Sequence, residues 1–137
     1  MTPRLLLRIS TGMLTLFLLG HALGSMAATS RDAAESAVFA AMQGYHFDIM
    51  GVTRSHWDFY QGLNHYLTAA LVVFLLLLVI TTRLADRSPA EARPLVWALT
   101  VGQALFAALS WMYFFPAPAV MTTVATVCLG SAALRLR

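Results

Sequence analysis

Long apolar runs separated by short polar stretches dominate the pattern of this chain. A helix needs about 20 mainly apolar residues to cross the hydrocarbon core of a bilayer. Four segments meet or approach that length, at residues 5–26, 62–82, 94–115 and 119–134. The pattern therefore predicts an all-α fold, an integral membrane four-helix bundle formed by residues 1–137 as a single domain.

Composition agrees with a membrane location. Hydrophobic residues make up 59% of the chain and charged residues 11%, whereas a soluble domain carries about 25% charge. The nine basic residues are all arginines, and they flank the apolar runs instead of forming a patch of their own. This distribution excludes nucleic acid as a partner. It predicts the lipid bilayer as the main partner, and leaves open a homo-oligomer or a larger membrane complex.

Arginine positions also predict an orientation. Two of the nine, Arg31 and Arg54, lie between the first and second predicted spans. The other seven would share the opposite side of a four-span protein: Arg4, Arg8, Arg83, Arg87, Arg93, Arg135 and Arg137. Because basic residues accumulate on the cytoplasmic side, the N-terminus, the C-terminus and the loop 83–93 are expected in the cytoplasm. The expected location is the bacterial cytoplasmic (inner) membrane, with segment 27–61 outside.

The first apolar segment has a second interpretation. A basic start, an apolar stretch and the small residues within 25–28 are also typical of a secretory signal peptide. Against cleavage, the apolar stretch is long for a signal core, and Gly12, Gly20 and Gly24 lie close to one helical face. Small residues spaced in this way let membrane helices approach closely. Retention as a span is therefore expected, whereas cleavage would leave three spans.

The external segment 27–61 is long enough to have structure of its own. Ser30 is a candidate N-cap, and Asp32 and Glu35 would stand early in a helix, where acidic groups suit the positive end of the helix dipole. Gly44 is a natural stop for that helix. A short amphipathic helix followed by a loop is therefore predicted between the first and second spans.

The end of the external segment contains two further signals. Residues 45–49 alternate between apolar and polar side chains, which predicts a short extended stretch. Ser55 followed by Asp58 is a variant of the capping box, in which each side chain bonds the other residue's backbone N–H. The second long helix is therefore expected to begin near His56.

A polar stripe marks the start of that helix. Steps of three, four and three connect Asp58, Gln61, His65 and Thr68, so these residues share one face. Polar groups that face lipid are costly, so this face should turn inward, where His21 lies at a similar depth. We therefore predict a binding site for a small molecule or lipid near the outer face, comprising His21, Arg54, Trp57, Asp58, Tyr60, Gln61 and His65.

Three other interpretations stay open. In the first, the polar residues only stabilise the fold: His21 donates to a backbone carbonyl, and Asn64 and Gln103 join helices by hydrogen bonds. In the second, His21, His56 and His65 contribute to a metal or haem site, although their spacing matches no strict motif. In the third, a histidine and aspartate pair performs acid–base chemistry on a membrane-soluble substrate. No nucleophile or nucleotide-binding loop accompanies that pair, so neither a catalytic residue nor a cofactor is assigned.

Two stretches carry a resemblance to a known kind of protein. GVTRSHWDFYQG at residues 51–62 and WMYFFPAP at residues 111–118 resemble a family of small bacterial four-helix membrane proteins of uncharacterised function. The gross layout is also similar to that of DoxX-type proteins. The family pattern has an aromatic residue and a glycine where Leu63 and Asn64 stand here. The resemblance implies four spans and a multi-pass accessory or ligand-binding protein, and its distinctive element would be Arg54, Trp57, Asp58, Tyr60 and Gly62.

Overall fold

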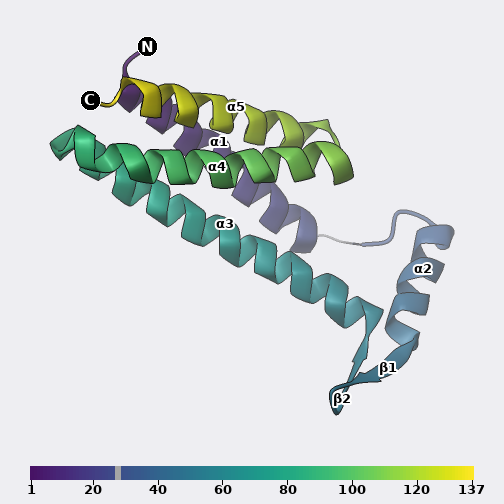
Figure 1. Cartoon of the computed structure of the whole chain (residues 1–137). Coiled ribbons are helices and arrows are strands. Elements are labelled where there is room, and N and C mark those ends of the chain that lie inside the picture. The colour runs from purple at the N-terminus through teal and green to yellow at the C-terminus, as the bar shows by residue number, and fades with distance from the viewer. Residues whose placement is uncertain (27–28) are drawn as a thin grey trace. The chain divides into compact units, whose positions relative to one another are not determined.

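The computed structural model describes residues 1–26 and 29–137. Within these residues the chain forms five helices and one hairpin of two strands (Figure 1). The elements in order are α1 (Pro3–Met26), α2 (Ala33–Gly44), β1 (His46–Ile49), β2 (Val52–Ser55), α3 (His56–Arg87), α4 (Pro89–Tyr113) and α5 (Pro116–Arg135). Four of the helices, α1, α3, α4 and α5, are long and apolar enough to cross a membrane. The predominantly helical fold is thereby confirmed.

The chain divides into two compact units. Residues 1–20 and 71–137 form the first, here called the helical unit, and residues 21–70 form the second, the hairpin unit. Both α1 and α3 contribute residues to each unit. The predicted single domain stays a prediction. Ala27 and Ala28, on which the signal-peptide interpretation partly depends, lie outside the described residues.

Small and aliphatic side chains from four helices form the core of the helical unit. Its most buried large side chains include Leu7 of α1, Leu78 of α3, Val96 of α4 and Leu129 of α5, each at most 1% exposed. In α4 and α5 the buried positions recur every three or four residues, so each helix turns one face inward. These two helices lie side by side and are connected only by residues 114–115 (Figure 1).

Residues 83–93, predicted as a cytoplasmic loop, are helical in all but one position. α3 continues to Arg87 and α4 begins at Pro89, which leaves only Ser88 between them. Leucine, alanine, arginine and glutamate in this stretch are strong helix formers. Proline at the first helical position is tolerated because the N–H that it lacks would have had no partner there. The proline and the mixed charges therefore mark a junction between two helices and not a loop.

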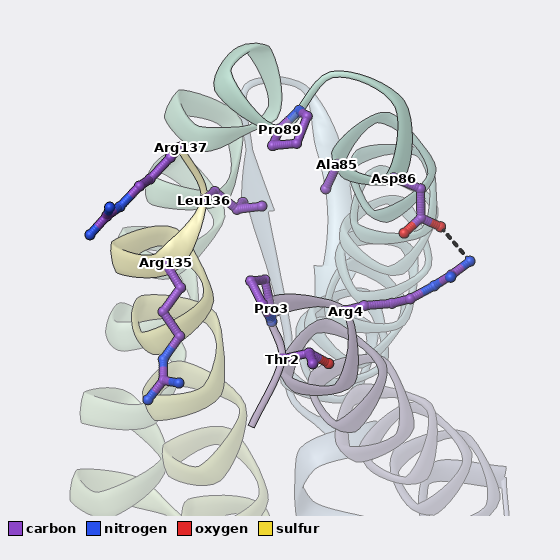
Figure 2. Close-up of a pocket in the computed structure, with 9 residues that line it drawn as sticks. All are labelled: Thr2, Pro3, Arg4, Ala85, Asp86, Pro89, Arg135, Leu136 and Arg137. Carbon is purple, nitrogen blue, oxygen red and sulfur yellow. Dashed lines mark hydrogen bonds and ion pairs between the residues drawn. The ribbon is translucent and has the colours of Figure 1, made fainter.

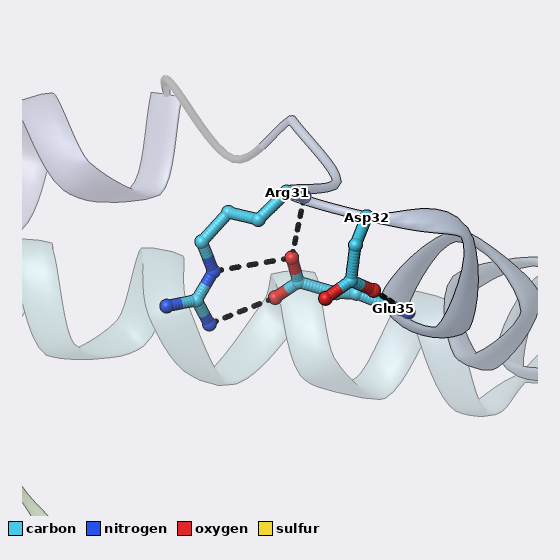
Figure 3. A network of polar contacts seen from close by, with 3 residues as sticks. All are labelled: Arg31, Asp32 and Glu35. Carbon is cyan, nitrogen blue, oxygen red and sulfur yellow. Dashed lines mark hydrogen bonds and ion pairs between the residues drawn. The ribbon is translucent and has the colours of Figure 1, made fainter.

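The N-terminus of α2 is capped by Asp32 and not by Ser30. Oδ1 of Asp32 accepts a hydrogen bond from the backbone N–H of Glu35 at 2.8 Å. The Glu35 carboxylate in turn accepts from the backbone N–H of Arg31 at 2.6 Å and from its guanidinium at 3.0 and 3.2 Å (Figure 3). A glutamate three residues after the cap allows this arrangement. Three residues after Ser30 stands an alanine, which cannot take part in it.

A two-stranded hairpin follows α2, which ends at Gly44 as predicted. β1 pairs with β2 in the antiparallel sense, and Ile49 lies opposite Val52. Both turn residues have a positive φ, 52° at Met50 and 80° at Gly51, which is the combination of a type I′ turn. The extended stretch predicted for residues 45–49 is confirmed as β1, while β2 is not among the predicted elements.

Candidate functional site

The capping box predicted at the start of α3 is present. The backbone N–H of Ser55 donates to Oδ2 of Asp58 at 2.8 Å, and the backbone N–H of Asp58 donates to Oγ of Ser55 at 3.1 Å. The Ser55 hydroxyl donates to the same Asp58 oxygen at 3.0 Å. The Asp58 carboxylate is therefore held by a local cap that begins the helix at His56, as expected.

Aromatic rings pack α2 against the beginning of α3. The ring of Phe39 in α2 lies 5.1 Å from that of Trp57, and the Trp57 ring lies 5.4 Å from that of Tyr60, measured between centroids. Aromatic pairs at such distances contribute about 1 kcal/mol beyond the burial of their area. The amphipathic helix α2 is thus attached within the hairpin unit by its half-buried Phe39.

A second group of rings joins the hairpin to the same helix. His56 stacks on Tyr45 with centroids 5.4 Å apart and 11° between the ring planes, and its ring lies 5.1 Å from that of Phe47. The Phe47 ring also lies 5.6 Å from that of Phe59, about one turn further along α3. These contacts hold β1 against the start of α3.

A groove of about 450 Å³ runs between the hairpin and the first turns of α3. This volume falls within the range of about 300–1,000 Å³ that is usual for small-molecule sites. Two of the lining residues are charged, and the remainder are aliphatic, aromatic or glycine. The lining consists of Ile49, Val52, Arg54, Asp58, Phe59, Gly62, Leu63 and Tyr66.

Of the predicted site residues, two line the groove and two others pack among aromatic rings outside it. Arg54 and Asp58 line the groove, so the structure brings these two together. The guanidinium of Arg54 also donates to the backbone carbonyl of Thr53 at 2.8 Å. Trp57 and Tyr60 pack on each other instead, and Trp57 also packs on Phe39 of α2. They do not line the groove.

The remaining three predicted residues, His21, Gln61 and His65, also lie outside the groove lining. Nε2 of His21 lies 3.1 Å from the backbone carbonyl oxygen of Asn64. This is the contact that the hydrogen-bonding interpretation predicts for His21. Gln61 is half-buried and His65 is exposed. Of the predicted polar stripe, Asp58 therefore belongs to a cap, Thr68 donates to the backbone carbonyl of Asn64 in its own helix at 3.0 Å, and His65 is exposed.

The metal interpretation has no cluster of ligands to support it. Among residues 1–26 and 29–137, no group of three or more His, Cys, Asp and Glu side chains could hold a metal ion. Of the weak candidates, His21 faces the carbonyl of Asn64 and His56 is stacked on Tyr45.

One predicted interhelical hydrogen bond involves Gln103 in the helical unit. Its side chain is 0% exposed, and Nε2 donates to the backbone carbonyl oxygen of Thr122 in α5 at 3.5 Å, a long distance for such a bond. Oε1 of Gln103 has no hydrogen-bond partner in the described part of the chain. Gln103 thus joins α4 to α5 weakly, at the cost of one unsatisfied buried oxygen.

The apolar residues that line the groove were not among the site residues predicted from the sequence. Phe59, Leu63 and Tyr66 follow steps of four and three along α3, which places them on one face. Ile49 and Val52 flank the turn and lie opposite each other. The helical spacing was readable in the sequence. The other side of the groove is formed by Ile49 and Val52, and their placement depends on a hairpin whose second strand was not predicted.

Comparison with protein families, curated proteins and solved structures found no match to this chain. The resemblance carried by residues 51–62 and 111–118 therefore stays a prediction.

Proposed function

We propose that this protein is an integral membrane protein in which α1, α3, α4 and α5 cross the bilayer. In the most apolar stretch of each helix, only 17% to 44% of the residues are buried within the protein. Leu105, Val127 and Ile80 are 63%, 62% and 61% exposed. Soluble proteins rarely expose apolar patches larger than about a few hundred Å². A bilayer removes this penalty, because lipid is as apolar as leucine.

The proposed orientation has the junction of α3 and α4 and both ends of the chain in the cytoplasm, in a bacterial inner membrane. Seven arginines and two carboxylates lie within residues 1–8, 83–93 and 135–137, against two arginines and four carboxylates within residues 27–61. The positive-inside rule assigns the arginine-rich side to the cytoplasm.

Retention of α1 is part of the proposal. Leu7 and Leu14 are 1% and 2% exposed in the core of the helical unit. The hydroxyl of Ser10, in the same helix, donates to the backbone carbonyl oxygen of Ala125 in α5 at 3.2 Å. Removal of α1 would expose this surface of α5, including a carbonyl that accepts an interhelical hydrogen bond.

The proposed function is to bind the hydrocarbon part of a lipid or lipid-like small molecule in the groove of the hairpin unit. The observation that carries this proposal is the lining of the groove, which is apolar apart from Arg54 and Asp58. Apolar walls with a few polar groups are typical of ligand sites. Asp58 is already bonded to Ser55, whereas Arg54 keeps further N–H donors beyond its bond to Thr53. The ligand's anionic or polar end is therefore expected at Arg54.

A photoactivatable fatty acid with a diazirine in its chain tests the groove. The purified protein in mild detergent is irradiated with this probe, and labelled residues are mapped by mass spectrometry. We expect labelling at Ile49, Leu63 and Tyr66 that unlabelled fatty acid suppresses. Labelling of exposed membrane helices, for example at Leu105, should not saturate in this way. Equal, unsaturable labelling at both places would contradict the proposal.

Gly62→Leu provides a variant that fills the groove without disturbing the helix. A Cβ at Gly62 would meet no atom within 4 Å, and leucine is a better helix former than glycine. We expect this variant to lose at least about tenfold in labelling of the groove, since the added side chain occupies part of the site. Gly24→Leu is the matched control, because Gly24 has equally open surroundings and does not line the groove. Unchanged labelling in Gly62→Leu would overturn the assignment of the groove as the site.

A further inference from the structure

A second recess lies in the helical unit, where residues 2–4 and 135–137 meet the junction of α3 and α4 (Figure 2). Its volume is about 380 Å³, large enough for a small ligand. We call it the arginine pocket, because three of its nine lining residues are arginines. The lining consists of Thr2, Pro3, Arg4, Ala85, Asp86, Pro89, Arg135, Leu136 and Arg137.

The arginine pocket has more hydrogen-bond donors than acceptors. One guanidinium nitrogen of Arg4 donates to Oδ2 of Asp86 at 2.9 Å, and one of Arg135 donates to the backbone carbonyl oxygen of Met1 at 2.8 Å. Arg137 makes no hydrogen bond or ion pair within the described residues. Each guanidinium carries five N–H groups, so most of the donors have no protein acceptor. Asp86 is the only carboxylate side chain in the lining.

The arginines stand on opposite sides of an apolar floor. Figure 2 shows Arg4 and its partner Asp86 on one side, Arg135 and Arg137 on the other, and the side chain of Leu136 directed between them. Leu136 is 4% exposed, so its side chain belongs to the floor. In this view the guanidinium groups of Arg4, Arg135 and Arg137 all point away from the space between them. Since these long side chains are exposed, they can turn toward an anion above the floor.

We infer that the arginine pocket binds the phosphate group of an anionic phospholipid. Guanidinium groups suit phosphate because their forked donors match its oxygens. Basic pockets between membrane helices on the cytoplasmic side bind such headgroups. A free phosphate would use only the cations, whereas a phospholipid also covers the apolar floor formed by Leu136 and Pro3. The inference depends on the proposed membrane location, but not on the groove of the hairpin unit.

Native mass spectrometry of the protein in mild detergent tests the inference with two lipids that have the same acyl chains. The probes are phosphatidylglycerol, which is anionic, and phosphatidylcholine, which has no net charge. We expect phosphatidylglycerol to bind at least about tenfold more tightly, since a basic residue at a membrane surface contributes roughly fivefold to the affinity for an anionic lipid. Equal affinities for the two lipids would overturn the inference.

Paired arginine variants distinguish the pocket from the general basic character of the helical unit. Arg135→Gln with Arg137→Gln should weaken phosphatidylglycerol binding by about 25-fold, on the same fivefold contribution per arginine. Arg83→Gln with Arg93→Gln removes the same charge from exposed positions outside the pocket, and should weaken binding by less than about fivefold. Equal losses in the two pairs would show that the lipid senses net charge alone, and would overturn the site.

A substitution that is expected to increase the affinity for phosphatidylglycerol provides a further test, because an unfolded variant would lose affinity instead. Asp86→Asn removes the carboxylate side chain of the pocket and releases Arg4 from its ion pair, so phosphatidylglycerol should bind about fivefold more tightly. Glu91→Gln makes the same charge change outside the pocket and should have a smaller effect. An Asp86→Asn variant that binds no better than Glu91→Gln would contradict the inference.

Inorganic phosphate distinguishes a lipid site from a site for a soluble anion. At a concentration equal to that of phosphatidylglycerol, it should not displace the lipid, because it cannot contact the apolar floor. Displacement by inorganic phosphate would overturn the lipid assignment. None of these variants lies in the groove of the hairpin unit, so fatty-acid labelling there should persist in all of them. The two sites can therefore fail separately.

Discussion

The helical unit and the hairpin unit are held together mainly by different kinds of side chain. In the helical unit, α4 and α5 turn small residues inward, such as Ala107 and Ala125, while Leu105 and Val127 are exposed. In the hairpin unit the contacts are made by large rings, for example those of Phe39 and Trp57. Small residues at helix interfaces are typical of membrane helices, where close backbone approach provides the attraction. Ring packing suits a segment in contact with water or the membrane interface.

Both units contain hydroxyl groups that bond within their own helix. Thr100 and Thr122 of the helical unit donate to carbonyls four residues earlier, each at 2.7 Å, and Thr68 of the hairpin unit does so at 3.0 Å. The hairpin unit also uses the hydroxyl of Ser55 in the cap of α3. Such a cap compensates for the first backbone N–H groups of a helix, which have no partner within it.

The largest expected effect comes from placing a charged side chain on the exterior of the helical unit. The same change on the exterior of the hairpin unit is the comparison. Leu76 in α3 and Val38 in α2 are both 57% exposed. Leu76→Arg should reduce insertion of α3 by about 3 kcal/mol, the cost of arginine near the centre of a membrane helix. Val38→Arg should change stability by less than about 0.5 kcal/mol, as is usual at a surface facing water. The measurement is the fraction of protein that remains in alkali-washed membranes.

Two other outcomes of this experiment would contradict the proposed difference in surroundings between the two units. Two small effects would mean that the exterior of the helical unit does not face lipid, contrary to the proposed function. Two large effects would mean that α2 lies within the bilayer as well. Leu76→Phe, which retains an apolar side chain, serves as the control and should insert normally.

Local signals in the sequence predicted much of this fold. The four apolar runs predicted the four long helices, because length and hydrophobicity are sufficient for that inference. Ser55 and Asp58 predicted the start of α3, because a capping box needs only residues three apart. The N-cap of α2 was wrongly assigned to Ser30, although a local signal identified Asp32. The glutamate that completes the cap stands three residues after Asp32, and this spacing was available in the sequence.

The groove could not be predicted in the same way, because it combines segments with a weak local signal. Met50 precedes Gly51 in the turn, and a bulky residue with positive φ is uncommon there. The turn therefore lacked the usual Asn-Gly signature, and β2 went unpredicted. Asp58, which the sequence predicted both as part of a cap and as a site residue, is bonded to Ser55 and also lines the groove.

An intermediate effect is expected from the cap of α3. Ser55→Ala removes the hydroxyl that accepts from the N–H of Asp58, and loss of such a cap costs about 1 kcal/mol. Ser36→Ala is the matched control, because Ser36 is exposed within α2 and alanine is the better helix former. Hydrogen exchange at the first amides of α3 should accelerate about fivefold in Ser55→Ala only. Equal exchange in both variants would mean that the hairpin and its rings, and not the cap, hold this end of the helix.

The smallest effect should come from the ion pair at the N-terminus of α2, which has no apolar surroundings to strengthen it. Side-chain hydrogen bonds from Arg31 are the main cause that lowers the pKa of the Glu35 carboxyl below its ordinary value of 4.5. Because the folded pKa is the lower one, the stabilisation is present above the ordinary pKa and is lost as the pH falls through the lowered pKa. Arg31 is 87% exposed, so salt should weaken the effect.

Carbon-detected NMR titration of the Glu35 carboxyl measures this pKa directly. In Arg31→Gln it should rise toward the ordinary value, whereas Arg54→Gln, which removes an equal charge elsewhere in the hairpin unit, should leave it unchanged. A Glu35 pKa that is insensitive to Arg31→Gln would mean that the pair does not persist in solution and that Asp32 alone caps α2. A rise in Arg31→Gln that high salt reproduces in the wild type would identify α2 as a helix surrounded by water, in contrast to the exterior of the helical unit.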